Sequence, residues 1–168
     1  MPQFMAQYAV SAYSGAQDLA RLIAQPVLRV ALAVPFLFSG LTKWDGFLNP
    51  APAAAYLFEN EFKLHLFGGL YSLPFPDTLA YIDGIAEVVL PVLLVIGLGT
   101  RFAAFGLLMM TAVIELVVPE GWANFHLPWA ALALAIIAIG PGALSLDHWL
   151  AKWGNRGANK LAVGQSGT

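Results

Sequence analysis

Four long apolar stretches dominate the chain, at about residues 27–44, 78–98, 102–118 and 126–139. The first three approach the roughly 20 residues that an α-helix needs to cross about 30 Å of hydrocarbon. The fourth is shorter, although apolar residues resume after a Gly140-Pro141-Gly142 break. The pattern predicts an all-α integral membrane protein, a bundle of four antiparallel helices with up-down topology.

The segments around these stretches divide the chain further. Residues 1–26 predict an amphipathic helix on the membrane surface, with Phe4, Tyr8, Leu19 and Leu22 as its apolar contacts. This segment lacks the ordered features of a cleavable signal peptide. We expect a short helix within the 45–77 connection, a four-helix domain over 27–150, and a flexible tail over 151–168.

Composition supports a membrane protein and removes several other classes. Hydrophobic residues make up 59% of the 168 residues and charged residues only 11%, more apolar surface than a soluble domain of this size can bury. The net charge of −2 provides no basic patch, so nucleic acid is not an expected partner. The absence of cysteine excludes disulfides, thiolate metal sites and thiol redox chemistry.

Two acidic residues lie inside the second apolar stretch. Asp83 and Glu87 are four residues apart and therefore share a helix face, with Glu87 about 12 Å into the span. Pro91 cannot donate a hydrogen bond to the carbonyl of Glu87. A buried ionisable group in a span costs several kcal/mol, roughly 2.5–3.5 on insertion scales, which favours a functional site. The alternative is a proline-kinked helix whose acid pairs with a neighbouring helix and serves packing alone.

Each of the four predicted spans brings an ionisable side chain to the same end of the bundle. We therefore predict one pocket in the outer leaflet that binds a small ligand, bordered by Lys43, Asp83, Glu87, Glu115, His126, Trp122 and Trp129. Each of these residues also has a purely structural interpretation. Lys43 could be a snorkelling lysine, Glu115 an interfacial acid and His126 a structural histidine, and the tryptophans could form an aromatic belt.

The 45–77 connection contains a weaker metal candidate. Glu61 and His65 have i,i+4 spacing and could bind a metal if that stretch is helical, whereas a solvated polar face explains the same pattern. The sequence shows no motif for an intrinsic cofactor. The three histidines do not face one another across the predicted bundle as haem ligands would.

Four motifs in fixed order resemble the DoxX family of small four-helix bacterial membrane proteins. Together they cover residues 27–150: Arg29 with Ser39-Gly40-Leu41-Thr42-Lys43; Glu87 followed by Gly97-Leu98-Gly99-Thr100-Arg101; the apolar span after Arg101; and Gly140-Pro141-Gly142 with Ser145-Leu146-Asp147.

This resemblance implies a protein of the bacterial inner membrane with a redox association. The family takes its name from a subunit associated with a quinone-linked thiosulfate oxidoreductase, and other members are linked to membrane complexes that handle oxidative stress. The long loop Glu59 to Pro76 and the segment Trp122 to Trp129 resemble a subgroup found beside copper-peptide maturation proteins.

Three functions follow as hypotheses. The first is an accessory subunit of a membrane oxidoreductase that binds quinone and depends on protein partners for electrons. The second is a non-enzymatic scaffold or assembly factor, and the third is a membrane protein that handles a metal such as copper. Whether the chain is itself catalytic stays open, because a non-catalytic subunit of an oxidoreductase would carry the same features.

The distribution of basic residues predicts the orientation. Arg21, Arg29, Arg101, Lys152, Arg156 and Lys160 lie at one set of span ends, whereas only Lys43 and Lys63 lie at the other. Because basic residues are enriched on the cytoplasmic side, both termini are expected in the cytoplasm, and the 45–77 connection faces outwards.

Single cysteines at Ser72 and Ser166 test this orientation, since the chain has no cysteine of its own. A membrane-impermeant maleimide applied to intact cells should label Ser72→Cys and leave Ser166→Cys unlabelled until the cells are lysed. The reverse pattern would overturn the topology.

Overall fold

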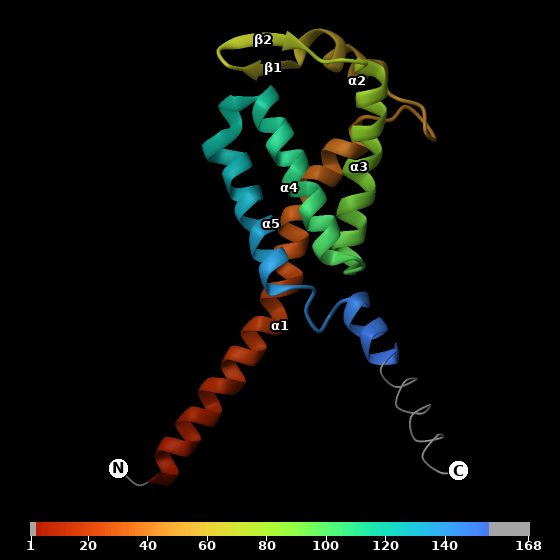
Figure 1. Cartoon of the computed structure of the whole chain (residues 1–168). Helices are drawn as coiled ribbons and strands as arrows, with labels where there is room; N and C mark the ends of the chain where they lie inside the picture. Colours follow the sequence, from red (N-terminus) through yellow and green to blue (C-terminus); the bar gives the residue numbers. More distant parts are fainter. Residues whose placement is uncertain (1–2, 155–168) are drawn as a thin grey trace, which may run out of the picture.

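The computed structural model describes residues 3–154, with side chains from residue 13 onward. Its four long helical segments form one bundle, as the apolar pattern predicts (Figure 1). The helices are α1 (Gln3–Thr42), α3 (Pro76–Ile96), α4 (Thr100–Val117) and α5 (Leu127–Ile139). Each segment is long and apolar enough to cross a membrane.

The bundle is closed by contacts of α1 with α3 and α5 and of α4 with α3 and α5. Its core consists of buried aliphatic side chains and alanines, with Phe36 as the one large aromatic: Leu32, Ala33, Phe36, Leu94, Ala103, Ala104, Leu107, Ala133 and Ile136. The small side chains on α4 and α5 let neighbouring helices approach closely, the packing mode that membrane helices favour.

The first span is longer than the sequence pattern suggested. α1 is one continuous helix that passes through Pro26 and extends beyond the bundle (Figure 1). Its apolar segment includes Tyr13–Thr42. From Gln3 onward, the segment expected as an amphipathic helix is the first part of this continuous helix. Leu19 and Leu22 are exposed on this helix, and the side chains of Phe4 and Tyr8 lie outside the described part.

The fourth span also begins earlier than expected. The segment before the fourth apolar stretch forms a 3₁₀ turn, η2 (Pro119–Gly121), and a π-helical turn, η3 (Trp122–His126). The N–H of Leu127 bonds to the carbonyl of Trp122, five residues back. Pro128 has no N–H to offer to the carbonyl of Asn124, which is consistent with a local π turn at this point.

Residues 44–75, which we call the cap, cover one end of the bundle. They contain α2 (Pro52–Tyr56), a π-helical turn η1 (Leu57–Glu61), and an antiparallel hairpin of β1 (Lys63–Leu66) and β2 (Gly69–Ser72). The short helix expected in this connection is confirmed, whereas the hairpin was not predicted. Nδ1 of His65 lies 3.3 Å from the Leu116 carbonyl oxygen, which holds the hairpin over the end of α4.

At the opposite end, the segment after α5 is fastened back onto the bundle. The buried Arg29 of α1 donates to the Leu144 carbonyl at 2.6 Å. The Asp147 carboxylate accepts from the backbone N–H of Gly99 at 2.7 Å and of Thr100 at 2.9 Å, and so caps α4. Burial alone would raise the pKa of Asp147, but these N–H donors outweigh it and hold the pKa below its usual value.

The chain is helical again from residue 146 to 154, so the first part of the expected flexible tail, 151–154, is helical. Residues 155–168 lie outside the described part. The start of α1 and this last helix lie at the same end of the molecule, opposite the cap (Figure 1).

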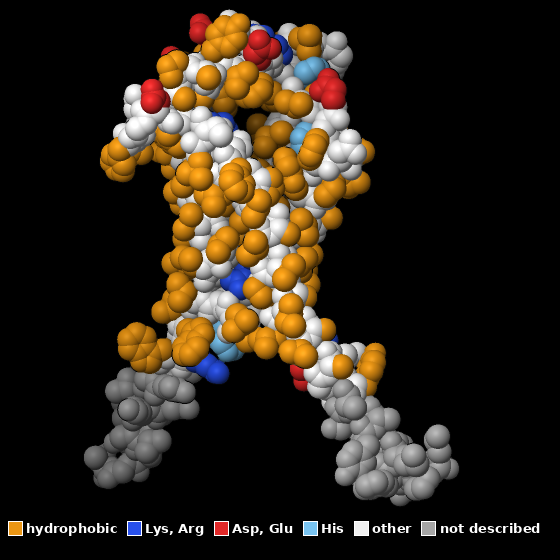
Figure 2. Space-filling model, turned by 180° about the vertical axis from the view of Figure 1, so that it is seen from behind, with side chains coloured by type: hydrophobic (Ala, Val, Ile, Leu, Met, Phe, Trp, Pro, Cys, Tyr) orange, Lys and Arg blue, Asp and Glu red, His pale blue; other side chains and the backbone are white. Residues whose placement is uncertain are grey.

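The surface of the bundle and the surface of the cap differ in their side chains. Figure 2 shows hydrophobic side chains along the length of the bundle, whereas acidic side chains gather over the cap. The apolar band includes the exposed residues Val30, Val34, Phe38, Val89, Val92, Phe102 and Phe105. In water such a surface would drive aggregation, whereas acyl chains solvate it without penalty.

The most extensive helix contact is between α1 and α3, and it depends on Gly40. A Cβ built on Gly40 would lie 2.8 Å from both the backbone carbonyl carbon and the Cβ of Glu87. No other residue leaves this space, because every other side chain begins with a Cβ. Gly40 therefore sets the distance at which Lys43, just beyond the end of α1, meets α3.

We predict that Gly40→Ala lowers the free energy of unfolding by about 1–3 kcal/mol, because overpacking forces α1 away from α3. The matched control is Gly15→Ala on the same helix, where a Cβ would meet nothing within 4 Å. That control should be neutral or stabilising by up to about 1 kcal/mol through helix propensity. Thermal unfolding midpoints in one detergent compare the two, and equal midpoints would contradict the close-contact interpretation.

Candidate functional site

An ion-paired cluster joins α1 to α3 just beneath the cap. Lys43 follows the last residue of α1, and its Nζ forms salt bridges with Oδ2 of Asp83 and, at 2.5 Å, with Oε2 of Glu87. The predicted pairing of Glu87 with Lys43 is thus confirmed. Asp83 and Glu87 reach the same ammonium because they lie one turn apart on one face of α3.

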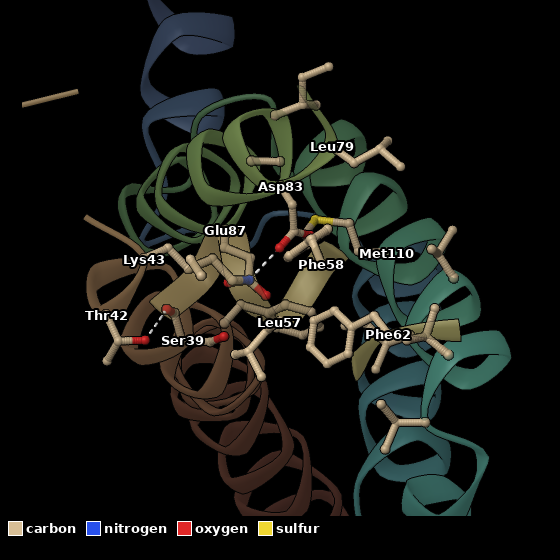
Figure 3. Close-up of a pocket in the computed structure, with 18 of the residues that line it drawn as sticks. Ser39, Thr42, Lys43, Leu57, Phe58, Phe62, Leu79, Asp83, Glu87 and Met110 are labelled. Carbon is tan, nitrogen blue, oxygen red and sulfur yellow. Dashed lines mark hydrogen bonds and ion pairs between the residues drawn. The ribbon is translucent and has the colours of Figure 1, made fainter. Parts of the chain in front are cut away.

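Burial makes this cluster energetically demanding. Glu87 is only 3% exposed, and the Lys43 side chain is 14% exposed. The Lys43 ammonium also lies over the Phe58 ring at 5.9 Å, and the Ser39 hydroxyl lies beside the Glu87 carboxylate (Figure 3). A buried charge is tolerated only when other charges and dipoles replace the lost water, and these neighbours supply that replacement.

The cluster forms one corner of a cavity of about 650 Å³. The cavity lies between α1, α3 and α4, with Trp129 of α5 in its wall and the cap as its roof (Figure 3). The cap residues that line the cavity are Ala53, Ala54, Leu57, Phe58, Phe62 and Leu73. Apart from Ser39, Thr42 and the three charged residues, the lining is apolar or aromatic. Such a volume lies within the range of small-molecule sites.

The cavity opens to the side of the bundle between α3 and α4. Ile82 of α3 and Met109 and Val113 of α4 line it, yet each is half exposed. Figure 2 shows a hollow beneath the cap, framed by hydrophobic side chains. The opening thus lies in the apolar band, where acyl chains would meet it, and not in the polar surface of the cap.

His126 and Glu115 form a separate pair. Nδ1 of His126 lies 2.6 Å from Oε2 of Glu115, which joins the start of α5 to α4. Gly121 makes room for this ring, since a Cβ there would lie 2.6 Å from Nε2 of His126. Neither His126 nor Glu115 lines the cavity. The expectation that all four spans contribute an ionisable group to one pocket is therefore wrong, because the groups form two clusters.

Trp129 lies between the two clusters. Its ring lines the cavity, packs 5.0 Å from the Phe36 ring and lies 5.5 Å from the His126 ring, measured between centroids. Trp122, the other predicted aromatic, is 47% exposed and lies outside the cavity lining. Of the seven predicted site residues, the structure thus brings together Lys43, Asp83, Glu87 and Trp129.

The condition for the predicted metal pair is not met. Glu61 ends the π-helical turn, Phe62 is extended, and His65 lies in β1, so Glu61 and His65 do not share a helix face. Among the described residues, no three His, Asp or Glu side chains gather as metal ligands would.

Sequence reasoning missed the roof of the cavity. Phe58, inside the π-helical turn, and Phe62, directly after it, are four residues apart and pack edge to face at 5.1 Å between ring centroids. Two phenylalanines at helical spacing within a charged connection were a signal that this connection folds back onto apolar surface. On the α4 wall, Met109 and Met110 supply flexible side chains that adapt to irregular shapes.

The DoxX family model matches residues 24–120, more than half of the chain. The chain belongs to the DoxX family. The match begins within α1 and runs through the cap, α3 and α4, so it includes the whole Lys43–Asp83–Glu87 cluster. No curated protein and no solved structure matches the chain significantly.

Family membership and the four apolar helices together make this DoxX protein a multi-pass membrane protein in contact with the lipid bilayer. The family motifs acquire structural roles: Gly40 admits α3, Lys43 pairs with Glu87, and Arg29 binds the segment after α5.

We predict that Lys43→Met destabilises the protein by about 3–5 kcal/mol, because it leaves two carboxylates buried without their counter-charge. The triple variant Lys43→Met, Asp83→Asn, Glu87→Gln removes both charges as well and should recover most of the loss. Thermal unfolding midpoints in detergent measure both effects.

Lys63→Met is the matched control, because Lys63 bonds at the exposed surface of the cap, and its effect should stay within about 0.5 kcal/mol. A triple variant no more stable than Lys43→Met would show that charge pairing is not what Lys43 contributes.

Proposed function

We propose that this DoxX protein is a quinone-binding accessory subunit of a membrane oxidoreductase. The observation that carries the proposal is the cavity of about 650 Å³ with one charged corner, apolar walls and an opening within the apolar band. A quinone has matching features: a flat ring with oxygen substituents and a long apolar tail.

The lining suits each part of such a molecule. Phe58, Phe62 and Trp129 provide aromatic faces for the ring, and offset or edge contacts between rings contribute about 0.5–1.5 kcal/mol each. The Lys43–Asp83–Glu87 corner provides hydrogen-bonding groups at one end of the ring. The opening beside Ile82 and Met109 lets the tail continue into the surrounding lipid.

We propose an accessory role because the electrons for quinone chemistry would come from another protein. Quinone chemistry requires an electron donor or acceptor, so we place the protein in a complex with a redox-active protein partner. We further propose the bacterial inner membrane as its location, with the cap on the outer side. Basic residues concentrate at the end opposite the cap, which supports this orientation.

The scaffold hypothesis remains the second candidate, supported by the fully apolar exterior of α5. Ala131 and Ala135 lie four residues apart on α5 at or near its surface, a spacing that permits close contact with another membrane helix. A scaffold requires such a surface but has no use for a charged cavity, so the cavity favours quinone binding.

Quinone content of the purified full-length protein tests the proposal. Membranes from quinone-containing bacteria, solubilised gently, should yield protein carrying close to one quinone per chain by chromatography and mass spectrometry. Ala86→Phe places a ring in the cavity and should remove most of that quinone, because Ala86 lines it beside the opening.

The matched control is Ala112→Phe on α4, at an exposed position outside the cavity lining. It should retain the wild-type content and correct for any general effect of an added phenyl ring on the detergent micelle. Quinone absent from the wild type, or retained equally by both variants, would contradict the proposal.

A further inference from the structure

The charged corner of the cavity offers more hydrogen-bond acceptors than donors. An ammonium has three N–H donors, and two of those of Lys43 point to Asp83 and Glu87. The same ammonium lies over the Phe58 ring. The hydroxyl of Thr42 donates to the carbonyl of Ser39 at 2.8 Å, so it is also engaged.

The carboxylate acceptors are less fully hydrogen-bonded than these donors. Lys43 contacts one oxygen of each carboxylate, Oδ2 of Asp83 and Oε2 of Glu87. An ionised carboxylate has two oxygens and about four lone-pair directions, so Asp83 retains acceptor capacity after pairing with Lys43. Glu87 is more fully engaged, because the Ser39 hydroxyl also lies beside it. The three groups also sum to a formal charge of −1, which disfavours anionic head groups such as lipid phosphates.

Asp83 is the carboxylate best placed to meet a ligand. Its side chain is 24% exposed, compared with 4% for Glu87, and it lies on the cavity wall one turn closer to the cap (Figure 3). A hydrogen bond to an ionised acceptor is roughly twice as strong as a neutral one, so a ligand hydroxyl directed at Asp83 would be held firmly.

This excess of acceptors affects the oxidised and reduced forms of a quinone differently. A quinone presents carbonyl oxygens, which only accept hydrogen bonds, whereas a quinol presents hydroxyl groups, which donate. A quinone carbonyl placed against Asp83 would face a carboxylate and lose its hydration without gaining a donor. The indole N–H of Trp129 is a further donor in the lining, but it belongs to the α5 wall.

We infer that the cavity selects the reduced quinol over the oxidised quinone, with Asp83 as the residue that sets this preference. The inference rests on the proposed function, since it assumes that the cavity binds this class of molecule. It concerns binding alone: the quinol hydroxyl donates to the Asp83 carboxylate, and no bond forms or breaks.

Direct binding to the full-length protein in phosphatidylcholine nanodiscs tests the inference. The probes are a decyl-tailed benzoquinol, kept reduced under anaerobic dithionite, and its oxidised benzoquinone. Because the chain has no cysteine, the reductant leaves no thiol chemistry to confuse the comparison. We expect the quinol to bind about tenfold more tightly or better, the factor that corresponds to one charge-assisted hydrogen bond.

Asp83→Asn should reduce this preference to near unity, because an amide offers a donor as well as an acceptor. Asp77→Asn is the matched control: Asp77 lies in the first turn of the same helix, outside the cavity lining, and its variant should keep the wild-type preference. The wild-type comparison decides the question even if Asp83→Asn folds poorly.

The outcomes distinguish a failure of the quinol selectivity from a failure of the proposed function. Equal binding of both forms, or tighter binding of the quinone, overturns the selectivity and leaves quinone-class binding intact. Binding of neither form overturns the proposed function itself.

Discussion

A lysine ammonium shared by two carboxylates is the interaction on which the cap end of this bundle depends. Inside an apolar bundle each of these charges alone would be prohibitive, and together they are stable only if their geometry is accurate. Gly40 fixes this geometry because it lets α1 approach the backbone of Glu87. Gly84 of α3 likewise leaves room for the ring of Trp44, which follows the end of α1. The cap then covers the cluster with Phe58.

The same arrangement explains why a cavity exists in a protein this small. α1 and α3 are held tightly together, and α4 is held against α5 through packing and through the His126–Glu115 pair. In the described part of the chain, α3 and α4 share no ion pair near the cap. The space between them stays open towards lipid, while Leu32, Leu94 and Leu107 fill the middle of the bundle. The site is thus the seam between two well-packed helix pairs.

Hydrophobic length and charge placement predicted much of this architecture. The four spans follow from the apolar stretches, and the Lys43–Glu87 pair follows from the cost of burying either charge alone. The grouping of His126 with Lys43 failed, because depth in a span says nothing about which face of the bundle a side chain takes. The roof of the cavity was also missed: the π-helical turn that positions Phe58 depends on tertiary contact with α3, which local propensity does not encode.

The central claim is that a lipid-soluble ring binds against the charged corner of the cavity. Photoaffinity labelling tests it most directly, using an azido-benzoquinone with a decyl tail on the full-length protein in nanodiscs, followed by peptide mass spectrometry. We expect adducts on cavity residues such as Phe58, Met110 and Trp129, suppressed by excess unmodified ligand. Adducts confined to the exterior of the bundle, or insensitive to that competition, would contradict it.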